Sequence, residues 1–193
     1  YETLQGASTS TPNSGSYNIA IGFGAGKSIS TGASNFFGGN GAGDSTTTGS
    51  NNTVIGNGSD ASSATVSNEI TLGNSSIATL RCQVTSITAL SDARDKTNVA
   101  PLQAGLNFVE HLAPVSFDWD MRDGGKVGVA DTGFIAQDLQ KVQIDTGITI
   151  PGLVFDENPD RLEAAYGKLV PVLVQSIKEL SAKVTELEAQ INS

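Results

Sequence analysis

The sequence contains few of the residues on which metal, redox or nucleic-acid chemistry is usually built. One cysteine, Cys82, excludes an intrachain disulfide and a CxxC zinc site, and one histidine, His111, excludes a histidine metal cluster. Charged residues make up only 16% of the 193 residues and the net charge is −9, which argues against electrostatic binding of nucleic acid. No apolar run reaches the roughly 18 residues of a membrane span. We therefore expect no metal, no cofactor, no nucleic-acid partner and no membrane insertion.

The composition changes sharply near residue 90. Residues 1–90 contain 14 of the 22 glycines but only six of the 31 charged residues, whereas residues 91–193 have an ordinary globular composition. Each part is about the size of one small domain. We predict two domains, at residues 1–88 and 89–193. Because the chain begins with Tyr-Glu and shows no signal peptide, we expect a mature or excised piece of a longer protein.

The glycine-rich part repeats at a constant interval. Gly22, Gly39, Gly56 and Gly73 are evenly spaced, seventeen positions apart, and each follows a short apolar segment such as Asn18–Ile21. A fixed short period is typical of stacked units that share one hydrophobic core. A flexible linker is the alternative that the composition suggests, but a linker needs no such register.

Each repeat offers only two or three apolar side chains in its strand, such as Ile19 and Ile21. Ordering one residue costs roughly 1–2 kcal/mol of backbone entropy, so we predict that one chain cannot bury a sufficient core by itself. Three chains that share their apolar faces would solve this problem, which predicts a parallel homotrimeric β-stalk. The repeats resemble the head repeats of trimeric adhesins and the Asn/Gly repeats of phage tail fibres.

A short charged motif, Ser91-Asp92-Ala93-Arg94-Asp95-Lys96, follows the change in composition at once. Further motifs come after it in this order: Leu112–Trp119, Gly133–Leu139, Tyr166–Leu173 and Ile177–Leu180. Together they resemble the intramolecular chaperone domain of phage endosialidases and tail fibres over about residues 89–193. Two departures are mild, since Asp138 stands where that family usually has glutamate and Ser176 where it more often has alanine.

The resemblance implies a domain that promotes trimer assembly and then cuts itself off. The scissile bond would be Leu90–Ser91, with Ser91 as nucleophile and Lys96 as proton acceptor. A serine hydroxyl needs a base within hydrogen-bond reach, and a lysine serves only when burial or a cationic neighbour lowers its pKa from about 10.4. Arg94 is the candidate neighbour, and Asp92 and Asp95 are candidates to orient the pair. The alternative interpretation is structural, because Ser-Asp commonly starts a helix.

The end of the chain carries an apolar heptad pattern, which we call the seam. Its members are Val170, Leu173, Ile177, Leu180, Val184, Leu187 and Ile191. Because Pro171 suits an early helical position, we predict a coiled-coil helix over about residues 170–192. β-Branched residues at the first core position favour two strands, whereas the predicted stalk and the resemblance favour three. We predict a trimerisation seam, and the alternative is the amphipathic core helix of a monomer.

The predicted fold class is therefore α+β and β, with a repetitive parallel trimeric β-stalk followed by a small α+β domain that ends in a long coiled-coil helix. We interpret the chain as part of a phage tail fibre or tailspike, assembled as a homotrimer in the host cytoplasm and located in the virion tail fibre. Its expected partners are upstream fibre segments, with a host cell-surface receptor as a further candidate. Catalysis is limited to one cut in its own chain. The alternative is a non-cleaving trimerisation cap of a fibre or surface adhesin whose stalk binds the receptor.

Overall fold

The computed structural model describes residues 14–83 and 87–192. The chain forms two compact units. One contains the residues up to Arg81 together with Asp118–Val129, and the other contains Cys82–Phe117 and the residues from Ala130 onward. None of the helices in the described residues is long and apolar enough to cross a membrane.

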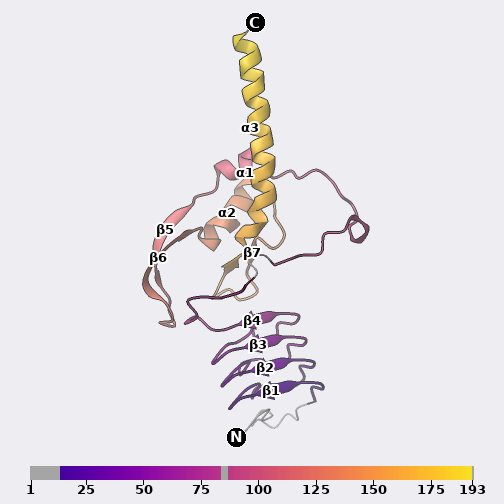
Figure 1. Cartoon of the computed structure of the whole chain (residues 1–193), viewed down its shortest axis with the longest axis vertical. Coiled ribbons are helices and arrows are strands. Elements are labelled where there is room, and N and C mark those ends of the chain that lie inside the picture. Colours follow the sequence, from indigo (N-terminus) through magenta and orange to yellow (C-terminus); the bar gives the residue numbers. More distant parts are fainter. Residues whose placement is uncertain (1–13, 84–86, 193) are drawn as a thin grey trace. The chain divides into compact units, whose positions relative to one another are not determined.

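A four-stranded parallel sheet dominates the first unit, and neighbouring strands come from successive repeats (Figure 1). The strands, in sheet order, are β1 (Ile19–Ile21), β2 (Phe36–Gly38), β3 (Thr53–Ile55) and β4 (Ile70–Leu72). Ile19 lies beside Phe36, which lies beside Thr53, so each strand is shifted by one full repeat from the last. The regular spacing of the sequence is therefore the register of this sheet. Each repeat makes one turn of the chain, which we call a coil.

The coils enclose apolar side chains of their own chain. Phe37 and Val54, the middle residues of β2 and β3, are fully buried and pack with Ala25 and Ile29 from the segments between strands. A glycine permits this packing, because a Cβ at Gly43 would lie 2.0 Å from the Phe37 ring. The prediction that one chain cannot bury a core within its repeats is therefore wrong. It counts the strand residues alone and leaves out the apolar residues of the turns.

Asparagines at equivalent positions of successive coils form a buried ladder. Asn35 and Asn52 are almost fully buried. The Asn35 side-chain amide donates to Asn18 Oδ1 at 3.0 Å and to the Gly49 carbonyl at 2.9 Å. Asn35 Oδ1 in turn accepts a hydrogen bond from the Asn52 backbone N–H at 2.9 Å. The ladder thus satisfies backbone groups that would otherwise be buried without partners.

Glu69 stands where the next asparagine of the ladder would be. Its backbone N–H donates to Asn52 Oδ1 at 3.0 Å, which continues the ladder by one step. Its carboxylate, however, accepts hydrogen bonds from the Ser62 backbone N–H at 2.8 Å and from the Thr71 hydroxyl at 2.9 Å. The side chain of Glu69 is thus engaged by Ser62 and Thr71, and the ladder of side chains ends there.

The remaining elements follow the four-stranded sheet in the sequence. These are η1 (Ala93–Asp95), α1 (Leu106–Glu110), β5 (Val115–Asp120), β6 (Val127–Gly133), α2 (Ala136–Thr146), β7 (Val154–Phe155), β8 (Glu163–Ala164), η2 (Tyr166–Lys168) and α3 (Leu169–Ile191). β5 pairs with β6, and β7 pairs antiparallel with β8. The structure is thus mixed sheet and helix, and the long C-terminal helix predicted from the heptads is present as α3.

The core of the second unit lies between α1, α2 and the start of α3. Phe108, Leu139, Leu153, Leu169 and Val172 are its largest buried side chains. Burying such a side chain contributes about 1.5–3 kcal/mol, so this cluster is the main source of stability for the unit. The cluster also fixes which face of α3 is turned toward the rest of its own chain.

Tyr166 ties the start of α3 to the end of β6. Its hydroxyl donates to the Phe134 carbonyl at 2.8 Å and accepts from the Phe134 backbone N–H at 3.1 Å. The two rings also meet edge to face, with centroids 5.4 Å apart. A Cβ at Gly133 would lie 2.9 Å from the Tyr166 hydroxyl oxygen, which explains a glycine at this point.

Candidate functional site

Ser91 and Lys96 are in direct contact. Lys96 Nζ lies 2.6 Å from Ser91 Oγ and 3.2 Å from the Ser91 carbonyl oxygen. The turn η1 lies between them, and Lys96 ends it with a backbone N–H that donates to the Ala93 carbonyl at 3.2 Å. One turn of 3₁₀-helix is thus enough to bring these two side chains together. A hydroxyl and an amine at this distance are suited to proton transfer.

Asp92 contacts Arg94, not Ser91 or Lys96. Its Oδ1 accepts from the Arg94 backbone N–H at 2.9 Å and from Nε at 3.0 Å, and its Oδ2 accepts from Nη2 at 2.6 Å. The Arg94 side chain, and then its backbone N–H, hold the pKa of the Asp92 carboxyl below its usual range. The same ion pair raises the pKa of Arg94. Asp92 is therefore the N-cap of η1, while Ser91 and Lys96 meet beside it.

The segment that carries the pair is exposed. Residues 87–103 are exposed throughout, and Leu90, which precedes Ser91, is 96% exposed. An ammonium in contact with water is strongly hydrated, whereas a lysine that acts as a base must be neutral. Within the described residues, the single chain thus brings nucleophile and amine together but does not exclude water from them.

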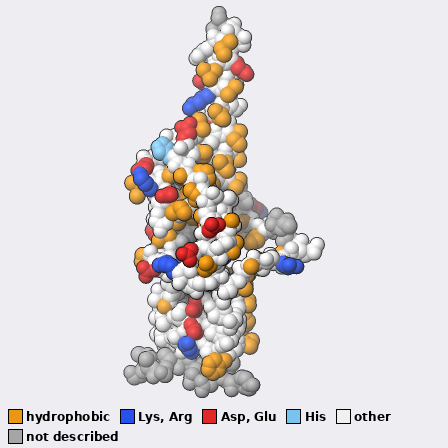
Figure 2. Space-filling model, turned by 90° about the vertical axis from the view of Figure 1, so that its left-hand side faces the viewer, with side chains coloured by type: hydrophobic (Ala, Val, Ile, Leu, Met, Phe, Trp, Pro, Cys, Tyr) orange, Lys and Arg blue, Asp and Glu red, His pale blue; other side chains and the backbone are white. Residues whose placement is uncertain are grey.

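The seam on α3 lies beside the face of the helix that packs into the core of its own unit. All seven seam residues are exposed, whereas Leu169, Val172 and Ser176 on another face of the helix are buried. Figure 2 shows hydrophobic side chains following one another along this helix. The buried face makes the contacts expected of a core helix, so the seam is left uncovered in the single chain.

Glu179 fixes the orientation of α3 against α1. Its Oε2 accepts from the Leu106 backbone N–H at 2.7 Å, and its Oε1 accepts from the Gln175 side chain at 2.8 Å. The Gln175 amide, followed by the Leu106 N–H, lowers the pKa of the Glu179 carboxyl. This carboxylate is thus already engaged within its own chain.

The sheet of the first unit also leaves apolar side chains uncovered. On either side of the buried middle residues, the strand residues point outward and form what we call the outer sheet face. Its exposed members are Ile19, Ile21, Ile55, Ile70 and Leu72. No charged residue lies within β1, β2, β3 or β4. Sequence reasoning assigns all strand residues to one shared face, because it lacks the division between inward and outward positions.

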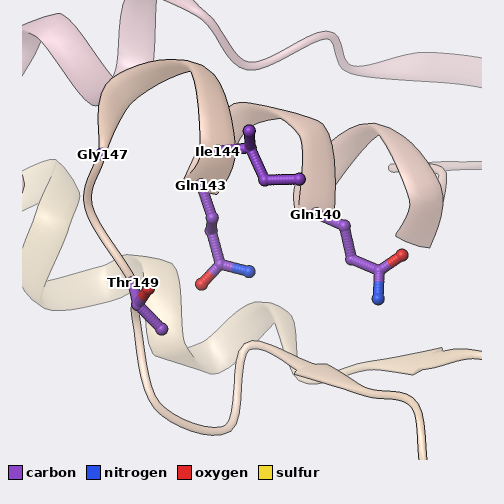
Figure 3. Close-up of a pocket in the computed structure, with 5 residues that line it drawn as sticks. All are labelled: Gln140, Gln143, Ile144, Gly147 and Thr149. Atoms are coloured by element: carbon purple, nitrogen blue, oxygen red, sulfur yellow. The ribbon is translucent and has the colours of Figure 1, made fainter.

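A hollow of about 480 Å³ lies at the end of α2 (Figure 3). Its lining is Gln140, Gln143, Ile144, Gly147 and Thr149. These residues include no acid, base or nucleophile suited to catalysis. In the described residues, no group of three or more His, Cys, Asp or Glu side chains could hold a metal ion. Ser91 and Lys96 therefore remain the best candidate for chemistry.

The comparisons with known proteins agree with this location. Residues 91–148 match the family model described as chaperone of endosialidase, so the match begins at Ser91 itself. The chain is also 31% identical over 105 residues to the long tail fiber protein Gp37 of Enterobacteria phage K3 and to that of Enterobacteria phage T2. The resemblance inferred from the sequence, to the chaperone domain at the end of phage tail fibres, is thus confirmed.

These relatives are much longer than the present chain. The aligned region covers 52% of this chain but only 8% of the phage K3 protein and 7% of the phage T2 protein. The chain thus spans less than a tenth of the length of the curated relatives it matches. No solved structure matches it significantly.

Proposed function

We propose that the chain is a segment of a virion tail fibre whose C-terminal domain, residues 89–193, assembles three copies and is then released by self-cleavage. Residues 1–88 form the fibre stalk in this proposal and join upstream fibre segments. The observation that carries it is the contact between Ser91 Oγ and Lys96 Nζ at the point where the chaperone match begins. The similarity to long tail fibre proteins supports the same assignment.

Assembly would use the two apolar surfaces that one chain leaves uncovered. The seam on α3 joins the C-terminal domains first, and the outer sheet faces of three chains then come together. Registration matters because a stalk built from equal repeats can slip by one coil at little energetic cost. Once the chaperone is gone, the stalk is held by its unfolding barrier, since no refolding aid remains attached.

Cleavage would proceed through the hydroxyl of Ser91. The neutral Lys96 amine takes the hydroxyl proton, and Oγ attacks the carbonyl carbon of Leu90. The bond between that carbon and the Ser91 nitrogen breaks, the nitrogen receives the proton from Lys96, and an ester joins Leu90 to Ser91 Oγ. Water then hydrolyses the ester. The products are a chain that ends in the Leu90 carboxylate and a chain that begins with Ser91.

The proposal predicts that the purified chain cuts itself between Leu90 and Ser91. Mass spectrometry and a denaturing gel should show a fragment beginning at Ser91. Ser91→Ala should abolish it, and Lys96→Met should slow its formation at least about a hundredfold, the usual contribution of a general base. Lys141→Met is the matched control, because Lys141 pairs with Asp145 on the surface of α2. An intact wild-type chain after long incubation, or unchanged cleavage of Ser91→Ala, would contradict the proposal.

A second candidate is a trimerisation cap that is never cleaved, on a fibre whose stalk binds a host receptor. The exposure of the segment around Ser91 favours it, because the single chain does not shield the Ser91–Lys96 pair from water. Light scattering separates the two candidates when it is combined with the gel. Trimers that stay intact support the cap, and trimers that lose residues 91–193 support the self-releasing chaperone.

A further inference from the structure

The seam on α3 has one charged residue on each of its two flanks. With the β-branched seam residues at heptad position a and the leucines at position d, position g falls on Leu169, Ser176, Lys183 and Gln190. Position e falls on Val174, Ser181 and Glu188. Lys183 and Glu188 are therefore the only flank residues of α3 that carry a charge.

These two residues do not pair within one chain. They are five positions apart, whereas neighbours on a helix surface are three or four apart. Among the described residues, the ion pairs involve neither of them. Glu179 lies one turn before Lys183 and attracts it, but its carboxylate is already bound by Leu106 and Gln175. Lys183 and Glu188 are thus available to another molecule.

A parallel neighbour in the same register would satisfy both charges. In parallel coiled coils, a residue at g faces the residue at e of the following heptad on the adjacent helix, five positions further on. Lys183 of one copy therefore faces Glu188 of the next copy. A slip of one heptad would put Ser181 opposite Lys183, and an antiparallel neighbour would bring like flank positions together.

We infer that the partner on the α3 seam is a second copy of this chain, parallel and in register, held there by an ion pair between Lys183 and the partner copy's Glu188. This inference rests on the proposed assembly function and adds how the copies are aligned. Only one heptad carries the pair, so only one alignment of the helices forms it. That alignment fixes how the C-terminal domains of neighbouring copies are matched.

Charge reversal tests the ion pair in the full-length Ser91→Ala chain, in which α3 stays attached. Lys183→Glu places a carboxylate opposite the carboxylate of Glu188 on the neighbouring copy, and Glu188→Lys places two ammonium groups opposite each other. Each variant should therefore raise the concentration at which the oligomer dissociates by about tenfold. The chain with both changes restores opposite charges and should return to the behaviour of the parent. Analytical ultracentrifugation over a concentration series measures all four proteins.

The matched control exchanges charges that lie off the seam, with Lys178→Glu and Glu186→Lys in one chain. It should dissociate as the parent does. The ion pair would be overturned if no reversal changed the concentration at which the oligomer dissociates, or if the double variant showed the sum of the two single effects. Either result would leave the proposed assembly intact. A parent chain that is monomeric at all concentrations would overturn the assembly proposal as well.

Discussion

Asp60 shows how the surroundings of one carboxyl group shape the stability of a coil. Its Oδ1 accepts a hydrogen bond from the Ser45 backbone N–H at 3.1 Å. Burial is the main cause that raises the pKa of this carboxyl, and the nearby charge of Asp44 adds to it. Asp44 itself is paired with Lys27 at 2.7 Å, and no ion pair among the described residues involves Asp60. The ionised form of Asp60 is therefore disfavoured in the folded coil.

We predict that Asp60→Asn raises the melting temperature at pH 7. Because the folded-state pKa is raised, the wild-type carboxyl contributes stability at acid pH and loses that contribution as the pH rises through its pKa. Asparagine keeps the oxygen that accepts from Ser45 and has no charge to bury. The gain should be smaller at an acid pH, at which more of the aspartate is protonated. Thermal melts at both pH values check this, and a gain that grows on acidification would contradict it.

The resemblance to the chaperone domain predicts the Ser91–Lys96 pair but not the contacts around it. The motif implies these two residues, and the structure places Lys96 Nζ 2.6 Å from Ser91 Oγ. The partner of Asp92 could not be predicted, because the choice between Arg94 and the pair depends on the backbone of η1. That turn directs both the Arg94 N–H and its guanidinium at the same carboxylate.

The sequence predicts the period of the coils, but it does not predict which side chains lie inside them. Glycines recur at the same places in successive coils because the turns need positive φ angles there, as at Gly22 and Gly39. The inward direction of Phe37, in contrast, follows from how the chain closes around it. Short strands with two apolar neighbours do not reveal which side chain lies inside. The sequence thus predicts a repeat but not its core.

The asparagine ladder leads to a second prediction, that Asn35→Ala destabilises the coils. The substitution leaves the Gly49 carbonyl and the Asn52 N–H without their partner in a buried place. Such a loss costs about 1–3 kcal/mol of the free energy of unfolding. Asn40→Ala is the control, because Asn40 is an exposed residue of the same repeat. Chemical denaturation followed by circular dichroism measures both, and equal losses would show that the ladder contributes nothing.

At the scale of the whole chain, two units of different character depend on each other in the proposed function. The coils are nearly free of charge and repeat themselves, so their own surfaces specify the alignment of neighbouring chains only weakly. The second unit does not repeat and has a seam with a single matched alignment. Sequence composition places a boundary near residue 90, where charge and glycine change together. The structural division falls after Arg81 and groups Asp118–Val129 with the coils, because that grouping depends on contacts between segments far apart in the sequence.

We therefore predict that a shortened chain ending at Leu90 is mostly insoluble when it is produced alone. Without the C-terminal unit, outer sheet faces should associate out of register and aggregate. The full-length Ser91→Ala chain is the control, since it keeps the unit attached and should stay soluble. Soluble fractions and light scattering report the result. A soluble trimer of the shortened chain would refute the chaperone role.

The end of the asparagine ladder at Glu69 also bears on how long such a fibre can grow. Strands in a sheet lie about 4.8 Å apart, so one inserted coil lengthens the stack by one such step. Insertion between two ladder asparagines leaves Glu69 and everything after it unchanged. The array of coils therefore changes length only in steps of one whole coil, counted from Glu69. Duplication of the gene segment that encodes one coil would lengthen the array by one coil and leave the residues from Glu69 onward unchanged.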